Sequence, residues 1–528
     1  MPLGPVARNP GSWRDRGRRA LALLLAATIA APACMFQHVD VRPIPLDARS
    51  QFIASPVKAH LKDGSTVVFT EGVTIGDGLL RGRGTRHDLD LTRAIPVDSV
   101  PLDSVAALEN FRTRSDVAAS TAMTLLAVGG GALATAFLLV AIFGSCPTVY
   151  SHGDTGPVLE AETFSHSIAP LLESRDLHRL GAGADPSGAV TLDVRNEALE
   201  THYINHLQLL EVTHPRGALV APGPDNRPLL LRGLRPFTTA VDRGGRDLGP
   251  VLAQADGQAF QSDAATLAAA ESGDLQDWID LTAPADGRKE MALVLRSKNS
   301  LLSTVLFYDV MLASAGPRAL AWIGSDLDQI STAVRLGRWV QRRLGMRVSV
   351  WRDGAYREVA RVPDAGPIAW KDAAVVLPVP PGESTLRVRL SFTPDLWRID
   401  RAALAGSVEP ASARTVAAAR VFGRDGRLDA QALAAIRDAD GRYLETMPGQ
   451  RFTVVFDAGP SPVSGERTFL LSSQGYYTEW IRADWLRADA SAAPFTPSDA
   501  AMRTALRRWR EVRGSMENDF ERHRIPVL

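Results

Sequence analysis

The sequence contains few cysteines and few lysines, and it has no excess of either charge. Two cysteines among 528 residues cannot build a disulfide framework, which excludes the small secreted domains held together by disulfides. Basic and acidic residues each number 59, so no overall field would recruit nucleic acid. We interpret the bias toward arginine as genomic rather than functional, with lysine only at Lys58, Lys62, Lys289, Lys298 and Lys371.

The composition is otherwise that of an ordinary globular protein. Hydrophobic residues make up 45% of the chain and charged residues 22%, which excludes a disordered, collagen-like or long coiled-coil chain. At about 150 residues per domain, the length predicts three or four structural units.

Residues 1–34 have the pattern of a secretory signal. Five arginines precede an uncharged run from Leu21 to Ala33, which is too short to cross a bilayer core of about 30 Å comfortably. The run ends in Ala31-Pro32-Ala33-Cys34, which resembles a bacterial lipobox, and this resemblance implies that Cys34 carries the lipid anchor. Two alternatives remain open: an uncleaved anchor, or an ordinary cleaved signal with an incidental cysteine.

A second apolar segment, residues 117–143, contains no charged residue. Its length predicts a membrane helix, although a buried hairpin in a soluble domain would be equally apolar. Arginines precede the segment and acidic residues follow it, so the positive-inside rule places the residues after 144 outside the cytoplasm. A lipidated Cys34 would place residues 35–116 outside the cytoplasm as well. A single full span by residues 117–143 cannot leave both flanking regions on the same side of the membrane. We expect the bulk of the chain to be extracytoplasmic.

Residues 35–110 are predicted to form a small β-barrel-like module. Two strands, Val57–Leu61 and Thr66–Phe69, flank the turn Lys62–Ser65, whose Asp-Gly pair suits a tight hairpin. With the later stretch Val100–Val105 and the glycine-rich apolar segment, this part of the chain resembles uncharacterised bacterial envelope lipoproteins. The resemblance implies a location in the cell envelope and carries no reaction with it.

The remaining sequence predicts a mainly β fold with some α-helix. Residues 146–344 are expected to form a β-rich domain with a helical pair, made of Leu301–Ala313 and a helix that begins at Pro317. Period-two alternation predicts an antiparallel β-sandwich over residues 345–410, which could be continuous with the preceding region. Residues 411–528 are expected to form a C-terminal β-rich module with a terminal helix from Ser498 that packs on the last sheet.

An aromatic group near the end of the chain is the candidate ligand-binding site. Aromatic rings can stack on sugars or anchor a protein partner. Period-two alternation places the first two members on opposite faces of a strand, so half of the group is expected in the core. The group comprises Tyr476, Tyr477, Trp480 and Trp485.

No motif for catalysis, metal or cofactor binding is recognisable. His202 and His206 are expected on the same face of a predicted strand, where residues four apart are separated by about 13 Å, too far for one metal ion. No Gly-x-Ser-x-Gly motif is present, and Cys146 has no neighbouring His-Asp grouping in the sequence. The catalytic residues, if any, are therefore unknown at this stage, and no metal site or cofactor is predicted.

These observations favour a membrane-anchored protein of the cell envelope with a non-enzymatic binding or assembly role. Its expected partners are membrane lipid and a protein or glycan, and not nucleic acid. The alternative is a hydrolase that acts on envelope polymers through a carboxylate pair, because such enzymes need no local motif. Two carboxylates about 5–9 Å apart in a deep cleft would favour that alternative.

Overall fold

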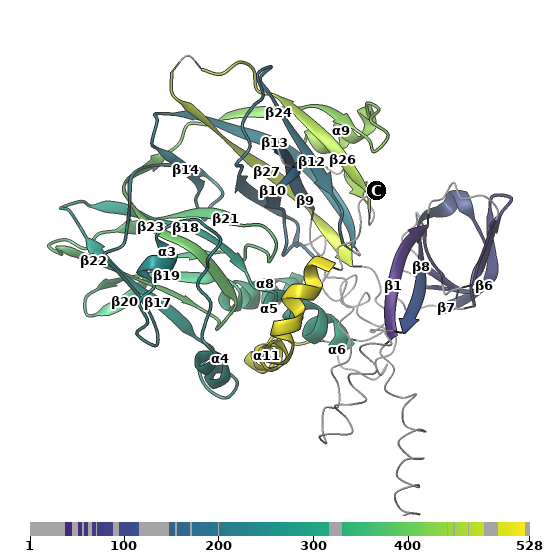
Figure 1. The fold of residues 1–528 in the computed structure, drawn as a ribbon, viewed down its shortest axis with the longest axis horizontal. Helices are drawn as coiled ribbons and strands as arrows, with labels where there is room; N and C mark the ends of the chain where they lie inside the picture. Colours follow the sequence, from purple (N-terminus) through teal and green to yellow (C-terminus); the bar gives the residue numbers. More distant parts are fainter. Residues whose placement is uncertain are drawn as a thin grey trace, which may run out of the picture. The chain divides into compact units, whose positions relative to one another are not determined.

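A computed structural model describes most of the chain, and the described residues are mainly antiparallel β-structure, as predicted (Figure 1). The chain divides into two compact units: residues 1–86 with 96–140, and residues 87–95 with 141–528, named below the N-terminal module and the main body. The described residues are 37–115 and 147–522, except 45–50, 55–56, 62–65, 70, 88–93, 154–155, 169–171, 199, 316–329, 441, 447–448, 463 and 480–494.

The predicted membrane features fall outside this range. Cys34 and the apolar segment 117–143 are not among the described residues, and neither is Cys146. Within the part of the chain that the structure describes, every helix is too short or too polar to span a membrane.

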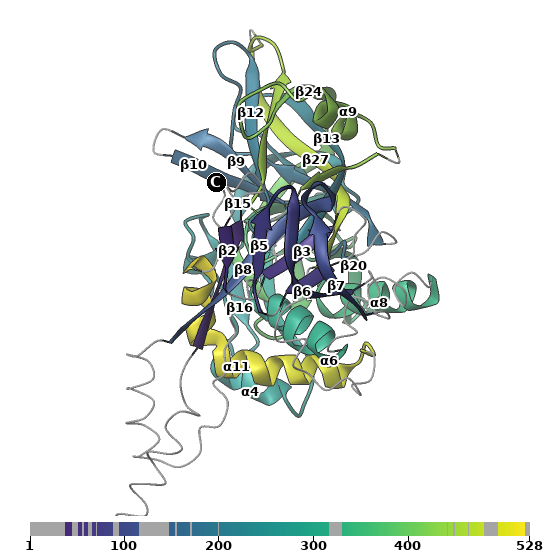
Figure 2. The same cartoon turned by 90° about the vertical axis from the view of Figure 1, so that its right-hand side faces the viewer.

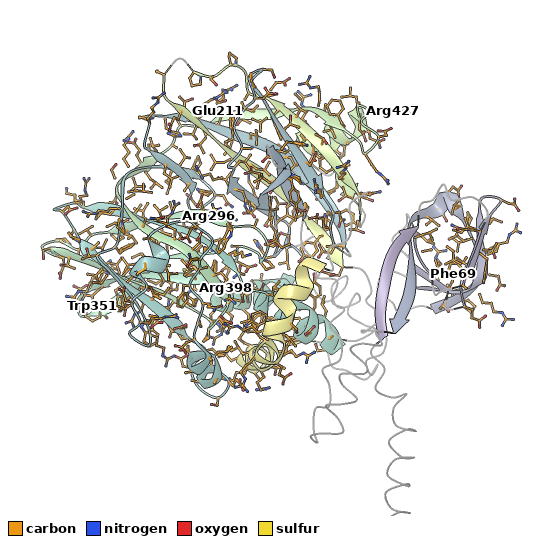
Figure 3. The ribbon with its side chains drawn as sticks, viewed as in Figure 1. Phe69, Glu211, Arg296, Trp351, Arg398 and Arg427 are labelled. Carbon is orange, nitrogen blue, oxygen red and sulfur yellow. The ribbon has the colours of Figure 1, made fainter. Side chains whose placement is uncertain are left out.

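The N-terminal module is one curved antiparallel sheet that curls into a nearly closed barrel (Figure 1). The predicted hairpin strands, Val57–Leu61 and Thr66–Phe69, are present and pair antiparallel. Phe69 lies fully buried inside the curl, among other apolar side chains of the strands (Figure 3). In spatial order the strands are β1 (Gln37–Ile44), β8 (Val105–Ser115), β3 (Val57–Leu61), β4 (Thr66–Phe69), β6 (Leu79–His87), β5 (Val73–Gly76) and β2 (Gln51–Ile53), with β7 (Ala94–Pro101) paired to β6.

The stretch Val100–Val105 is not one continuous strand. A short 3₁₀ turn, η2 (Leu102–Ser104), separates β7 from β8. The Ser104 hydroxyl donates a hydrogen bond to the carbonyl oxygen of Pro101 at 2.6 Å. This local side-chain bond competes with the strand ladder and turns the chain.

The largest sheet of the main body combines strands from its two ends. Residues 189–195 pair with residues 451–457, and the long strand at 200–214 pairs with the one at 466–479. In spatial order the strands are β10 (Gly156–Glu162), β9 (Thr148–Gly153), β12 (Ala189–Arg195), β26 (Arg451–Asp457), β24 (Arg414–Phe422), β13 (Glu200–His214), β27 (Glu466–Glu479) and β11 (Ser174–Arg179), with β25 (Leu444–Thr446) paired to β13.

Two smaller antiparallel sheets complete the β-structure of the main body. The first contains β14 (Leu219–Pro222), β15 (Pro228–Pro236), β23 (Trp397–Pro410), β18 (Glu290–Asn299) and β21 (Lys371–Pro378) in that order. The second contains β16 (Thr239–Asp242), β17 (Asp277–Pro284), β22 (Thr385–Phe392), β19 (Met346–Arg352) and β20 (Ala355–Val362).

The ranges 146–344, 345–410 and 411–528 are therefore not separate modules. Each sheet of the main body pairs strands from at least two of these ranges: β12 with β26, β15 with β23, and β17 with β22. Alternation along the sequence shows which residues form strands, but it contains no information on the distant strand that each one pairs with. The continuity that the sequence left open between 146–344 and 345–410 is present, whereas the separate module over 411–528 was wrong for this reason.

The helices at residues 302–315 and 499–522 pack together, whereas the helix at 430–437 lies against β13 and β24 of the large sheet (Figure 2). The predicted helix at 301–313 is present but widens into a π-helical turn, η4, and the partner expected from Pro317 is described only from Ile330. The helices are α3 (Gly249–Leu252), α4 (Ala264–Ala270), α5 (Leu302–Thr304), η4 (Val305–Leu312), α6 (Ala313–Ala315), α8 (Ile330–Arg343), α9 (Ala430–Arg437) and α11 (Asp499–Arg522).

The terminal helix α11 is present but does not pack where we expected. It contacts η4, α4 and α5 instead of the last sheet (Figure 2). Trp509 is fully buried, and its indole Nε1 donates a 2.7 Å hydrogen bond to Asp395 Oδ2. This bond fixes α11 to the loop between β22 and β23, and so closes the helical layer.

Candidate functional site

A cavity of about 570 Å³ lies in the main body, between the large sheet and the helices. Its size is within the range of about 300–1,000 Å³ that small-molecule sites occupy. The wall is formed by the end of β10, the following residues 165–168, the start of β11, η4, α8 and the loop after β20. Most of the wall is apolar, including Leu306, Phe307, Met311, Leu336, Trp339 and Leu344.

One part of the wall is acidic. Glu162, at the end of β10, and Asp364, in the loop between β20 and β21, both line the cavity, together with His166. These residues come from segments about 200 positions apart in the sequence. Two carboxyl groups on the wall of an otherwise apolar cavity are the main candidate for recognition of a ligand.

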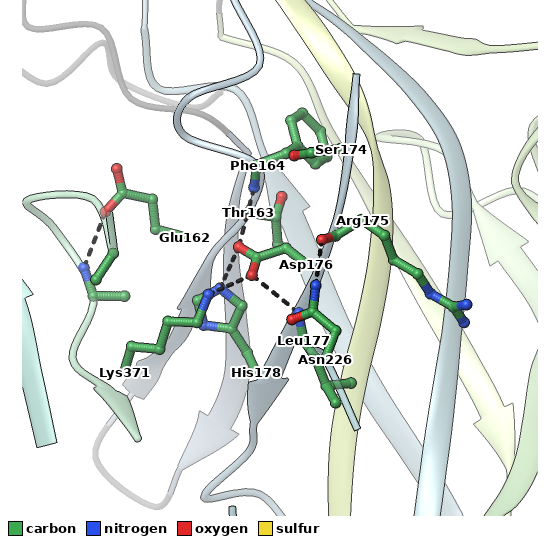
Figure 4. Close-up of polar contacts among 12 residues, drawn as sticks. Glu162, Thr163, Phe164, Ser174, Arg175, Asp176, Leu177, His178, Asn226 and Lys371 are labelled. Carbon is green, nitrogen blue, oxygen red and sulfur yellow. Dashed lines mark hydrogen bonds and ion pairs between the residues drawn. The ribbon is translucent and has the colours of Figure 1, made fainter. Parts of the chain in front are cut away.

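Glu162 is almost completely buried, and one of its two carboxylate oxygens is bound (Figure 4). Oε2 accepts backbone hydrogen bonds from Ile368 at 2.7 Å and from Ala369 at 3.3 Å. Within the described residues, Oε1 has no hydrogen-bond partner. Burial raises the pKa of Glu162 to about 8, and the two backbone bonds oppose this only in part.

The loop that carries Asp364 is shaped around the Glu162 carboxyl group. Gly366 has a φ of +77°, and a Cβ atom at this position would lie 2.5 Å from the Glu162 Cδ atom. Only glycine avoids this overlap while keeping the left-handed backbone. Asn299 holds the loop from the other side. Its side-chain Oδ1 accepts a hydrogen bond from the backbone amide of Ala365 at 2.7 Å, and its backbone amide donates to the carbonyl oxygen of Gly366 at 2.8 Å.

Asp364 is a partly buried carboxyl group without a partner. Among the described residues it makes no hydrogen bond and no ion pair, and its Oδ1 atom is buried. Burial raises its pKa to about 7, while Lys371 lowers the pKa and Asp176 raises it. Unpaired acids of this kind are unusual in folded proteins and are concentrated at functional sites.

A second acid near the cavity, Asp176 on β11, is fully paired (Figure 4). Lys371 Nζ contacts its Oδ1, and His178 Nε2 lies 2.9 Å from its Oδ2. The amides of Leu177, at 3.0 Å, and Phe164, at 3.4 Å, also donate to this carboxylate. Burial acts to raise the pKa of Asp176, but Lys371 and His178 outweigh it and hold the pKa well below its ordinary value.

The Asp176–Lys371 pair positions the cavity wall. It joins β11 of the large sheet to β21 of the neighbouring sheet, and Arg179 with Asp372, at 3.2 Å, joins the same two strands. Between Glu162 and Asp176 the chain turns sharply at Phe164, whose φ is +44°, a strained value for a bulky residue. The buried Phe164 ring and the amide bond to Asp176 maintain that turn.

The remaining polar groups of the wall differ in whether they are bound. Arg361 is tied to Glu358, with contacts of 3.0–3.3 Å, and to the carbonyl oxygen of Gln341 at 3.0 Å. Burial lowers the pKa of His166, so its ring is neutral at physiological pH. In the described part of the chain, Nδ1 of His166 has no hydrogen-bond partner.

The structure separates the predicted aromatic group. Tyr476 faces away from the cavity and stacks on Tyr203 with 4.6 Å between ring centroids. Tyr477 is buried, lines the cavity, and donates to the carbonyl oxygen of Ser165 at 3.1 Å. The predicted opposite faces are present, whereas Trp480 and Trp485 lie outside the described residues.

The histidines of β13 do not gather around a metal. His202 contacts Glu200 at 3.2 Å, and His214 contacts Thr468 at 2.9 Å. A β-bulge between Ile204 and His206 shifts the register, so His202 and His206 lie on opposite faces and not on the same face as we expected. No cluster of three metal-ligating side chains occurs among the residues that the structure describes.

A half-buried ladder of aromatic and arginine side chains crosses the sheet that contains β17, β20 and β22. Arg243 and Arg389 lie over the Trp278 ring at 4.7 and 4.8 Å, and Arg389 also lies over Tyr356 at 4.2 Å. Asp280 binds Arg389 through two contacts of 2.7 Å. Because guanidinium groups already cover these rings, the ladder is a weaker candidate for stacking on sugars than a free platform would be.

Sequence reasoning missed the cavity because its acids carry no motif. One signal was available: of the five lysines in this arginine-rich chain, two lie beside the cavity's acids. Lys371 pairs with Asp176, and Lys298 lies over the Trp370 ring at 5.1 Å and reaches Ile368 O at 3.5 Å. Lysine's compact ammonium fits buried places that the planar guanidinium of arginine does not.

Comparisons with known proteins do not supply a function. No family model and no curated protein matches the chain. Among solved structures, the secreted serine protease VesC from Vibrio cholerae aligns at 8% identity and a TM-score of 0.13, over 71% of this chain and 99% of that chain.

Proposed function

We propose that this chain is a membrane-anchored protein of the bacterial cell envelope whose main body binds a small, mainly apolar molecule. The observation that carries the proposal is the 570 Å³ cavity, which has an apolar wall and a few convergent polar groups. A cavity of this composition is the usual form of a ligand site. The role is binding, with no cofactor, and the large sheet and helices act as a rigid support for the wall.

The envelope part of the proposal rests on the sequence. The signal-like residues 1–34, Cys34 and the apolar segment 117–143 together support an anchor, with the main body outside the cytoplasm. Lipid labelling of the wild type and of Cys34→Ser tests the anchor: we expect label in the first and none in the second. Protease treatment of spheroplasts tests the location, and a main body that stays protected until lysis contradicts it.

Ligand binding is tested with toluene, an uncharged apolar probe, by ligand-observed NMR on the full chain in nanodiscs. Gly337 on α8 lines the cavity, and a Cβ atom there would meet open space, so Gly337→Phe obstructs the cavity without a backbone clash. Gly514→Phe on α11 is the matched control, because Gly514 is exposed and also has open space. We expect toluene to bind the wild type and the control but not Gly337→Phe. Equal signals from all three contradict cavity binding.

The second candidate is the hydrolase that acts on envelope polymers. The observation in its favour is the pair of carboxyl groups with raised pKa values, Glu162 and Asp364, on one cavity wall. The mainly apolar wall favours binding over hydrolysis, because a sugar polymer needs many polar contacts. Release of soluble fragments from purified cell walls by the wild type, and not by Glu162→Gln or Asp364→Asn, would establish the hydrolase instead.

A further inference from the structure

We propose that the ligand of the cavity is an organic amine, whose ammonium group binds between Asp364 and Glu162 while its apolar part fills the cavity. This proposal rests on the proposed function, since it requires that the cavity bind a small apolar molecule. It adds the charge and the hydrogen-bonding character of that molecule.

Neither carboxyl group is fully paired within the described residues. Glu162 is 1% exposed and leaves Oε1 without a hydrogen bond, and Asp364 makes no hydrogen bond or ion pair within the described residues. A buried carboxylate without a donor is costly, so groups of this kind are normally paired. The partner that these two carboxyl groups lack is a hydrogen-bond donor, and a cation satisfies both of them best.

The nearby cations of the protein are already engaged. Lys371 contacts Asp176, Arg361 binds Glu358, and Lys298 lies over Trp370 and reaches a backbone carbonyl group. Within the described residues none of the three hydrogen-bonds Asp364 Oδ1 or Glu162 Oε1, and Lys298 and Lys371 act on the two acids through their charge alone. An anionic ligand would therefore meet two unpaired acids without a cation of its own to bind.

The wall of the cavity is mainly apolar and partly aromatic. Phe307, Tyr308 and Trp339 line the cavity, and their ring faces attract cations as well as apolar groups. An inorganic cation would lose its hydration here and gain few oxygen ligands, whereas an organic amine brings its own apolar surface. The wall and the acids together thus select an ammonium group on an apolar body.

Binding of an amine should depend on pH in a particular direction. The charged and titratable groups that face the two acids are His166, Asp176, Lys298, Arg361 and Lys371. With pKa values of about 8 for Glu162 and about 7 for Asp364, both acids are partly or fully protonated at pH 6. Ammonium binding requires their ionised form, so affinity should rise between pH 6 and pH 8 and protons should be released on binding. The affinity for an anionic ligand would instead fall between pH 6 and pH 8.

The experiment compares three probes of similar shape on the full chain in nanodiscs: phenethylamine, phenethyl alcohol and hydrocinnamate. We expect phenethylamine to bind about tenfold or more tightly than the alcohol at pH 8, and hydrocinnamate to bind weakest, since a charge-assisted hydrogen bond is stronger than a neutral one. Equal or tighter binding of the alcohol or of hydrocinnamate overturns the amine. Failure of all three probes and of toluene refutes cavity binding itself, and so the proposed function.

Variants locate the ammonium group. Asp364→Asn should weaken phenethylamine by about tenfold and leave phenethyl alcohol within about twofold, and Glu162→Gln should act in the same direction. Asp457→Asn and Glu409→Gln are matched controls on exposed carboxylates, and both should leave the amine's affinity unchanged. If either cavity variant destabilises the protein, the pH profile of the wild type decides alone: an affinity that does not rise from pH 6 to pH 8 overturns the proposal.

Discussion

The main body holds two kinds of buried acid: Asp176 is paired within the protein, whereas Glu162 and Asp364 are not fully paired. Figure 4 shows Asp176 and Glu162 with their partners. Asp176 is bound by Lys371, His178 and two backbone amides, and its pKa is held well below the ordinary value. Glu162 and Asp364 keep unpartnered oxygens, and burial raises their pKa values to about 8 and about 7.

The difference distinguishes an acid that supports the fold from acids that are available to a ligand. The paired acid joins β11 to β21 and fixes the frame, so its charge is compensated within the protein. The unpaired acids line a cavity, where their charge can be compensated only from outside. The same residue type is therefore structural in one place and available to a ligand in the other, and four substitutions or conditions test this contrast.

The largest effect is expected from Lys371→Met. It leaves Asp176 buried without its cation, so we expect the free energy of unfolding to fall by about 3–5 kcal/mol in urea denaturation. Replacing both partners, as in Asp176→Leu with Lys371→Met, should recover most of the loss, because two apolar groups leave no unpaired charge. A double variant no more stable than Lys371→Met would show that the ion pair is not the cause.

The next effect is expected from Gly366→Ala. The new methyl group overlaps the Glu162 carboxyl group and the backbone is left-handed, so we expect a loss of about 1–3 kcal/mol. Gly382→Ala is the matched control: its φ is +81°, but its Cβ atom would meet open space. The difference between the two melting temperatures isolates the contact with Glu162, and equal losses would mean that only backbone strain matters.

A smaller effect is expected from pH. The folded-state pKa of Glu162, about 8, lies above its ordinary value of 4.5, so the folded protein holds more protons than the unfolded chain between these values. Stability from this group therefore falls as pH rises through that window. We expect the slope of the melting temperature between pH 5 and pH 9 to be shallower in Glu162→Gln than in the wild type. Parallel slopes would contradict the raised pKa.

The smallest effect is expected from Asp364→Asn. Asp364 has no partner within the described residues, so its replacement removes no interaction and should change the free energy of unfolding by less than about 0.5 kcal/mol at pH 5. Differential scanning calorimetry measures this. A loss as large as that of Lys371→Met would show that Asp364 has a structural role and would remove the contrast between the two places.

The local elements of the fold could be predicted from the sequence to a useful degree. The hairpin strands Val57–Leu61 and Thr66–Phe69 are present at the expected residues, because a short polar turn and alternating apolar residues act locally. The terminal helix is present for the same reason, with Met502, Leu506 and Trp509 buried on one face. Its packing partner was missed, since an apolar stripe specifies burial but not the surface that covers it.

The candidate site could not be predicted, and its residues show why. Glu162 ends a strand, and Asp364 lies in a loop about 200 positions later, with nothing in either neighbourhood to mark a function. Their proximity depends on the pairing of β11 with β27 and on the contacts from β11 to β21. The aromatic group that did stand out was divided by period-two alternation into Tyr476 on one face and Tyr477 on the cavity side.

The sequence by itself determined the mainly β class, the strand and turn positions, and the expectation of an envelope anchor, because each depends on neighbouring residues or on composition. Tertiary structure alone decided which strands share a sheet, that β12 pairs with β26, and that Glu162 and Asp364 meet at one cavity. The physical reason is that burial and the absence of a partner are properties of the surroundings. A carboxyl group acquires a pKa of about 7 or 8 only when distant segments remove it from water.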